Sequence, residues 1–429
     1  MEHWRVMPSP HATQQTVWRA LWTSRLAILL CGVAGVLQIG VAPGAVAAYD
    51  PTRLTAPFGY FANALVAPLA RWDSSWYLTI ARFGYAHIRQ RMAFYPLYPL
   101  LMHVLGWVTR SDLVAGVLIS LVALGIALVL LHRLVSLDFG EEIATTTVLL
   151  VAFCPVSFFL SAVYTESLFL ALSLGSIYAA RRDRWLLCGI LGFLAATSRN
   201  GGIALILPTA IIYLYGPRAA AGAALTRWAP ERGGWRVLLP RHRLRPDVLW
   251  LGLIPAGLVA YLAYLGLRYG DTLAPFRVES IWYRHTTFPV TTAWDGAEQA
   301  WNGLRQLLQG PVPPDRVPIY AQGLIGAALQ DVYLFLFLVL GVTGLVLVFW
   351  WVGFAYGIYT LALLVLALAD PVSLQPLASL PRYELIIFPL FIVGARLVTR
   401  HRMTAYAIPA FTVLLGLFTV EFATWRWVA

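Results

Sequence analysis

Long apolar runs dominate the chain, and short polar segments separate them. Runs close to 20 residues, the length that crosses the hydrocarbon core of a bilayer as a helix, recur throughout the sequence. This pattern predicts an all-α polytopic membrane protein with about 11 transmembrane helices. By residue number, the expected helices are 23–47, 112–132, 143–163, 165–181, 185–199, 201–216, 248–269, 331–349, 351–369, 383–398 and 404–421.

Composition supports the same class of protein. Hydrophobic residues make up 59% of the 429 positions and charged residues only 12%, which is too little charge to cover the surface of a soluble protein. All 31 basic residues are arginine, a side chain that binds phosphate through two parallel hydrogen bonds. The three cysteines lie in apolar runs without metal-ligand spacing. We therefore expect lipid surroundings and no nucleic-acid partner.

Arginine placement predicts the orientation of the helices. Cytoplasmic loops of membrane proteins are enriched in basic residues, and three segments fit that rule: the turn 181–184, the segment 217–247 and the segment 396–402. These anchors agree only if the apolar segment Ala93–Val108 does not span, so we expect it in the membrane interface. The chain is then one membrane domain over 1–429, with the N-terminus cytoplasmic, a basic cytoplasmic loop at 217–247, and outside loops at 48–111, 270–330 and 370–382.

The first outside loop carries the most unusual combination of side chains. It reads RWDSSWYLTIARFGY from Arg71 to Tyr85 and continues with AFYPLYPLL. An aromatic belt at the membrane surface explains the rings, but it does not explain Asp73. That carboxylate either caps a helix or takes part in chemistry. The candidate residues of this loop are Arg71, Trp72, Asp73, Trp76 and Tyr77.

Further candidates lie in the next outside segments. In FCPVSFFLSAVYTESLFLAL, Glu166 stands at the head of a helix, where the helix dipole favours it, and it also reads as an ionisable group of a site. The turn SRNGGI is either a plain turn or a break that exposes backbone N–H groups. The later segments YGDTLAPFRVESIWYRH and PRYELIIFPLF add an aromatic ring and two arginines. The candidates here are Tyr164, Glu166, Arg199, Asn200, Trp282, Arg284 and Arg382.

Helix parity places two carboxylates and several arginines of these segments on one face of the membrane. A carboxylate can take a proton from a hydroxyl group, and arginines can stabilise a departing phosphate. The combination fits a substrate that carries both groups. A transporter of lipid-linked sugars is the alternative, although we find no internal repeat and the polar groups cluster on one face.

The quoted motifs, in this order and spacing, resemble the PIG-V family of mannosyltransferases over roughly 71–203. The resemblance implies the GT-C fold and a sugar donor carried on polyprenyl phosphate. It identifies Asp73 as the acidic residue of the first outside loop and Arg199 as part of the Arg-Ser-Asn-Gly-like turn, although here Asn200, Gly201 and Gly202 follow.

The resulting hypothesis is an inverting glycosyltransferase at the outer face of the cell membrane. It would move a hexose, with mannose as the expected sugar, to a hydroxyl of a lipid, glycan or protein. Asp73 is the candidate base, and Glu166 assists it or orients the acceptor. Arg199, Arg284 and Arg382 are the candidates for phosphate, and Trp76 and Tyr77 for the sugar. No cofactor and no cluster of metal ligands is evident in the sequence, and a divalent ion near the carboxylates stays open.

Overall fold

The structure is a computed structural model, and it describes residues 10–86, 88–216, 240–310 and 326–428. Over these residues it is built from helices without a β-strand, so the prediction of an all-α membrane protein is confirmed. Within these described ranges, five helices are long and apolar enough to span a bilayer. They are α1 (Pro10–Gln38), α6 (Asp112–Phe139), α11 (Leu253–Tyr269) with its 3₁₀ extension η6 (Pro246–Gly252), α14 (Ala327–Trp351) and α18 (Thr404–Ala423).

Shorter apolar helices complete the bundle, so each of the eleven predicted segments contains a helix. They are α7 (Glu141–Phe153), α8 (Glu166–Arg181), α9 (Trp185–Ser198), η4 (Asn200–Leu205) with α10 (Ile206–Tyr215), α15 (Phe354–Leu368), and α16 (Leu380–Leu385) with α17 (Phe388–Arg400). Several predicted bounds need correction. In the first segment the long helix α1 ends at Gln38 and a separate short helix begins at Ala45, and the segment 383–398 is interrupted before Phe388.

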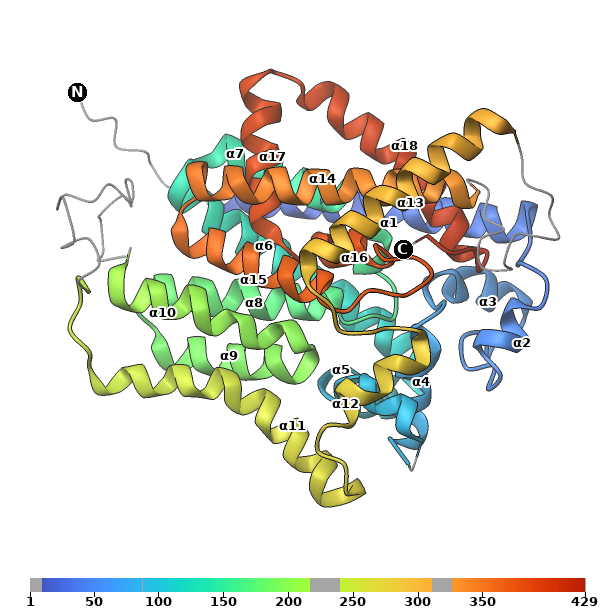
Figure 1. Ribbon diagram of the computed structural model, residues 1–429, viewed down its shortest axis with the longest axis horizontal. Helices are drawn as coiled ribbons and strands as arrows, with labels where there is room; N and C mark the ends of the chain where they lie inside the picture. The colour runs from blue at the N-terminus through green and yellow to red at the C-terminus, as the bar shows by residue number, and fades with distance from the viewer. Residues whose placement is uncertain (1–9, 87, 217–239, 311–325, 429) are drawn as a thin grey trace.

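Mostly short helices gather at one end of the bundle, on the right of Figure 1. We call this end the site end. It holds α2 (Ala45–Tyr49), α3 (Tyr60–Val66), η1 (Ala67–Leu69), α4 (Ser74–Phe83), η2 (Arg89–Ala93), α5 (Leu97–Thr109), α12 (Ala274–Arg277), η7 (Val278–Trp282) and α13 (Pro289–Gln309). The predicted basic loop lies largely outside the described residues, from 217 to 239.

The predicted span 143–163 is not one helix. Helix α7 ends at Phe153, and a fully buried loop containing η3 (Ser157–Leu160) leads to α8. A loop at membrane depth needs partners for its backbone groups. Arg25 of α1 supplies part of them, because its guanidinium donates to the carbonyl oxygens of Ala152, in the last turn of α7, at 2.6 Å and of Ser157 at 2.8 Å. Pattern reasoning missed this break because the loop is as apolar as a helix.

Helix α5 packs beside α4 and α6 at the site end and leaves an apolar stripe uncovered. Its exposed side chains are Leu100, Val104, Trp107 and Val108, which fall on one helical face. An uncovered apolar face fits a helix that lies in the membrane interface. The position of α5 relative to a bilayer remains a prediction.

Single cysteines at the exposed positions Arg89 and Arg110, which flank α5, should test this prediction. If α5 does not cross the membrane, an impermeant maleimide added outside intact cells should label both positions. The matched control is a cysteine at Arg182, in the turn after α8, which we expect to react only after the cells are opened. Labelling of Arg89 and Arg110 from opposite sides would contradict the topology.

Candidate active site

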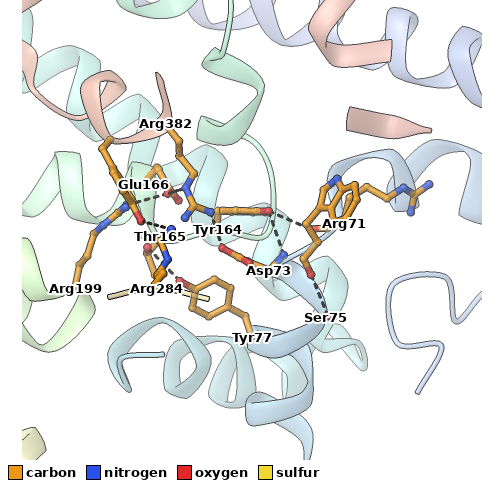
Figure 2. A network of polar contacts seen from close by, with 12 residues as sticks. Arg71, Asp73, Ser75, Tyr77, Tyr164, Thr165, Glu166, Arg199, Arg284 and Arg382 are labelled. Atoms are coloured by element: carbon orange, nitrogen blue, oxygen red, sulfur yellow. Dashed lines mark hydrogen bonds and ion pairs between the residues drawn. The ribbon is translucent and has the colours of Figure 1, made fainter. Parts of the chain in front are cut away.

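A cavity of about 940 Å³ opens at the site end and brings together segments from the whole chain. Its walls come from α4, the start of α8, the turn between α9 and η4, the segment η7–Arg284, and the loop before α16 together with α16 itself. Figure 2 shows the polar network at its centre. The predicted residues that line the cavity are Trp72, Asp73, Trp76, Tyr77, Glu166, Arg199, Asn200, Trp282, Arg284 and Arg382.

Asp73 precedes the first residue of α4, yet its side chain does not cap the helix. Instead, its Oδ2 accepts a hydrogen bond from Arg382 Nη1 at 2.5 Å. Its backbone N–H donates to the Tyr164 hydroxyl at 3.2 Å. The carboxylate is 31% exposed and lines the cavity, so it is open to a ligand. Of the two readings left open by the sequence, the geometry favours chemistry over capping.

Glu166 is the first residue of α8 and is held between two arginines. Its Oε1 lies 2.8 Å from Arg199 Nη1 and 3.4 Å from Arg382 Nε. The side chain is only 2% exposed, and Oε2 has no hydrogen-bond partner among the described residues. A buried carboxylate at membrane depth is costly unless charge and dipole offset it. Here the N-terminus of α8 provides the dipole, and the guanidinium groups of Arg199 and Arg382 provide the opposite charge.

Arg382 on α16 joins the two carboxylates into one cluster. Its guanidinium contacts Asp73 with one nitrogen and Glu166 with another, and it lies over the rings of Tyr164 and Tyr383 at 5.4 Å from each centroid. The planar, delocalised charge of arginine suits this bridging position, which the compact ammonium of lysine cannot fill. Arg382 therefore sets the distance between the two acidic groups.

In the turn SRNGGI, Arg199 lies between the end of α9 and the start of η4, and these two helices pack closely against each other. A Cβ at Gly202 would lie 2.3 Å from the backbone nitrogen of Ala196, so only glycine fits there. The backbone N–H of Gly201 donates to Asn200 Oδ1 at 2.8 Å, and that of Gly202 donates to the Arg199 carbonyl oxygen at 3.0 Å. The alternative that this turn exposes N–H groups for a ligand is therefore wrong at both glycines.

A second charged cluster lies on the wall formed by η7. Arg284 Nη1 donates to the carbonyl oxygen of Asp370 at 2.7 Å, its Nη2 donates to the Tyr383 hydroxyl at 3.4 Å, and its Nε lies 3.6 Å from Glu279 Oε2. Glu279, Asp370 and Tyr383 all line the cavity, and sequence reasoning missed them. Glu279 and Tyr383 stand within quoted motifs, but the motif pattern alone did not distinguish them from their neighbours.

Three partly exposed rings form an aromatic wall. Trp76 stacks on Phe94 with a centroid distance of 5.8 Å, and Trp282 meets Trp76 edge-on at 5.7 Å and Phe94 edge-on at 6.0 Å. All three line the cavity. The flat apolar faces of such rings suit the C–H faces of a sugar as well as an isoprenoid chain. Tyr77 is more deeply placed, and its hydroxyl lies 3.4 Å from Thr165 Oγ1.

Two predicted binding residues, Arg71 and Tyr164, are not among the residues that line the cavity. Arg71 is 3% exposed, and its Nε donates to the carbonyl oxygen of Ala423 at 2.8 Å. Figure 2 shows its guanidinium pointing away from Asp73 and Glu166. Tyr164 is 2% exposed and supports Asp73 and Arg382 from behind. Their contacts indicate that they position the site.

The cavity thus offers a partly exposed carboxylate next to several guanidinium groups. A carboxylate can accept a proton from a hydroxyl group, and guanidinium groups can bind the oxygens of a phosphate. Among the residues that the structure describes, no group of three or more histidine, cysteine, aspartate or glutamate side chains could hold a metal ion. The donors present therefore fit an oxygen-rich anionic ligand.

Burial raises the pKa of Glu279 to about 7; the Arg284 charge opposes the shift, and Asp370 and Asp73 add to it. A carboxyl whose pKa is higher in the folded state makes the protein less stable as pH rises from about 4.5 to 7. Glu279→Gln should remove this loss. We expect the melting temperature of the variant, relative to wild type, to rise over that interval and then level off. Glu298→Gln, an exposed change on α13, should show no such trend, and a flat difference for Glu279→Gln would contradict the assignment.

Comparison with known proteins finds similar sequences for the first half of the chain. Residues 24–207 match the family model described as mannosyltransferase (PIG-V). GPI alpha-1,6-mannosyltransferase 2 of Rattus norvegicus is 32% identical over 172 residues, which is 36% of this chain and 34% of that protein. The Homo sapiens protein of that name is 28% identical over 169 residues with the same coverage. The chain therefore matches about a third of the length of these relatives, and the predicted resemblance to the PIG-V family is confirmed over these residues.

Two solved structures align with the chain at low scores. A crystal structure of the Archaeoglobus fulgidus oligosaccharyltransferase aligns with 94% of this chain and 53% of that chain, at 13% identity and a TM-score of 0.41. A second structure of the enzyme, in complex with an inhibitory peptide and a dolichol-phosphate, aligns with 94% of this chain and 55% of that chain, at 13% identity and a TM-score of 0.36. The all-helical description of the present chain comes from its own helices and not from these alignments.

Proposed function

Taking the PIG-V match of residues 24–207 as the premise, we propose that this protein is a membrane glycosyltransferase. It moves a hexose, expected to be mannose, from a polyprenyl-phosphate donor to an acceptor hydroxyl on a lipid, glycan or protein. The observation that carries the proposal is the placement of Asp73: a partly exposed carboxylate that lines the cavity and is paired with Arg382 instead of capping α4.

Asp73 is the proposed base. The ion pair with Arg382 engages Oδ2, so Oδ1 remains available to an acceptor hydroxyl. As the acceptor oxygen bonds to the anomeric carbon, its proton passes to Asp73, and the bond from that carbon to the phosphate oxygen breaks. The polyprenyl phosphate leaves with the bonding electron pair. Attack from the face opposite the phosphate inverts the configuration of the anomeric carbon.

The arginines support the departing phosphate. Arg199, Arg284 and Arg382 all line the cavity, and each uses only some of its N–H groups on protein partners. The remaining donors can bind phosphate oxygens as negative charge develops there. Glu166 holds Arg199 and Arg382 in place. It therefore affects both the arginines proposed to bind phosphate and, through Arg382, the proposed base Asp73. The site end then faces the outside of the cell membrane, in keeping with the basic turn 181–184, which lies at the end of α8 opposite Glu166.

The direct test is an assay of the purified protein with polyprenyl-phosphate-mannose and a panel of lipid, glycan and peptide acceptors. We expect transfer of mannose with inversion of the anomeric carbon. The transporter alternative predicts movement of the donor across proteoliposomes with no transfer product. Absence of transfer with every acceptor, together with such movement, would overturn the proposal.

Arg284→Lys should weaken use of the donor more than use of the acceptor. Lysine keeps the charge but loses the contact pattern that holds Arg284 to the Asp370 carbonyl oxygen and presents its remaining N–H groups. One lost charge-assisted hydrogen bond predicts an increase of roughly tenfold in the apparent donor constant. Arg277→Lys, at an exposed arginine of the same loop, is the matched control. A larger effect on the acceptor constant would show that Arg284 does not bind phosphate.

A further inference from the structure

The segment Thr424–Val428, which follows α18, lies against the cavity and is tightly held. Its Trp425 and Val428 side chains are each 2% exposed. Trp425 has a φ of +60°, so the chain turns sharply as it leaves the helix. Helix α14 fixes the far end, because the Tyr333 hydroxyl and the Gln330 amide donate to the Val428 carbonyl oxygen. We call Thr424–Val428 the tail segment.

Within the tail segment, Trp427 reaches the substrate cavity. It is one of the residues that line the cavity, and its Nε1 donates to Gln375 Oε1 at 3.2 Å. Gln375 also lines the cavity, and its amide donates to Asp331 Oδ1 at 3.1 Å. The ring of Trp427 is therefore locked in orientation by a chain of hydrogen bonds that ends on α14.

The tail segment packs on Trp72, the residue directly before Asp73. The Trp72 ring meets Trp427 edge-on at 5.1 Å and Trp425 at 5.6 Å, and Tyr49 covers another side at 4.6 Å. Trp72 has a φ of +52°, a left-handed backbone conformation that is unfavourable for a bulky side chain. Such a conformation is strained and persists only where surrounding contacts impose it. The aromatic rings around Trp72 are those contacts.

From this arrangement we infer that the tail segment is part of the active site and that Trp427 is a positioning residue for Asp73. Trp427 and Trp425 hold Trp72 in its left-handed conformation, and that conformation sets the direction in which the chain enters α4. The direction in turn decides where the Asp73 carboxylate lies in the cavity. This inference rests on the proposed function, in which Asp73 takes the proton of the acceptor.

The kinetic test is a double-mutant cycle between Trp427 and Asp73. Trp427→Ala should lower kcat by about ten- to a hundredfold, since small misplacements of a catalytic group have effects of that size. Trp427→Phe keeps an edge-on ring but loses the Nε1 bond to Gln375, so it should recover part of the loss. In the Asp73→Asn background, Trp427→Ala should cause no further loss, because both changes act through the same carboxylate. Equal and additive losses in both backgrounds would overturn the inference.

A second measurement does not depend on activity. In a background with the three native cysteines replaced by alanine, Val428→Cys should react slowly with maleimide, and adding Trp427→Ala should accelerate the reaction. Trp185→Phe, a buried ring that packs edge-on against Tyr213 and does not line the cavity, is the matched control and should change neither rate nor kcat. Fast labelling with Trp427 intact would overturn the inference. Slow labelling with an inactive wild type would instead contradict the proposed function.

Discussion

Asp73→Asn should reduce sugar transfer by about a hundred- to ten-thousand-fold, the usual contribution of a positioned general base. Asparagine retains an oxygen that can accept the hydrogen bond from Arg382 Nη1, but it cannot take a proton from the acceptor. Because the side chain is 31% exposed, the melting temperature should stay close to that of wild type. The measurement is turnover and thermal unfolding of the purified variant, side by side with wild type.

Asp73→Ala separates catalysis from helix capping. A capping carboxylate would be replaced well by asparagine and poorly by alanine. The Asp73 side chain makes no capping bond to α4, so neither variant should lose stability through loss of a helix cap. Both variants should lose turnover, because neither side chain can accept the proton. Asp271→Asn, which changes an aspartate outside the cavity that pairs with Arg277, is the control. Wild-type turnover in Asp73→Asn would remove Asp73 as the base and make Glu166 the leading candidate.

Arg382→Gln should cause the largest loss of stability at the site, about 3–5 kcal/mol, together with loss of transfer. The change removes the cation shared by Asp73 and Glu166 and leaves a deeply buried carboxylate with Arg199 as its remaining partner. Breaking a buried ion pair from one side has a cost of this size because the other charge stays buried. Thermal unfolding in detergent at fixed lipid content measures the effect.

The double variant Arg382→Gln with Glu166→Gln tests the cause of that loss. Neutralising Glu166 removes the buried negative charge that Arg382 no longer offsets, so part of the stability should return while transfer stays absent. Glu166→Gln alone is the matched single change. A double variant that is less stable than Arg382→Gln would show that packing of Arg382 on Tyr164 and Tyr383, and not its charge, holds the site.

Several features of this protein follow from the sequence alone. Each of the eleven predicted apolar segments contains a helix, because the length and hydropathy of a spanning helix are local properties of the chain. The aromatic and acidic motifs from Arg71 to Ile203 identify the PIG-V resemblance, which the family match over 24–207 confirms. They also bring Asp73, Glu166 and Arg199 forward as candidates, and the structure places all three in one cavity.

Other features depend on contacts between distant parts of the chain. The partner of Asp73 is Arg382, which lies 309 positions away, and no local pattern pairs these two residues among 31 arginines. The apolar loop after α7 resembles a helix in sequence, but in the structure distant side chains bond its carbonyl oxygens: the Arg25 guanidinium bonds Ser157 and the Ser120 hydroxyl bonds Ala162. Hydrophobic periodicity shows which face of a helix is buried. Ion pairs and ring contacts depend instead on how the helices are arranged relative to one another. Only the tertiary structure therefore brings Glu279 and Trp427 to the cavity wall and moves Arg71 away from it.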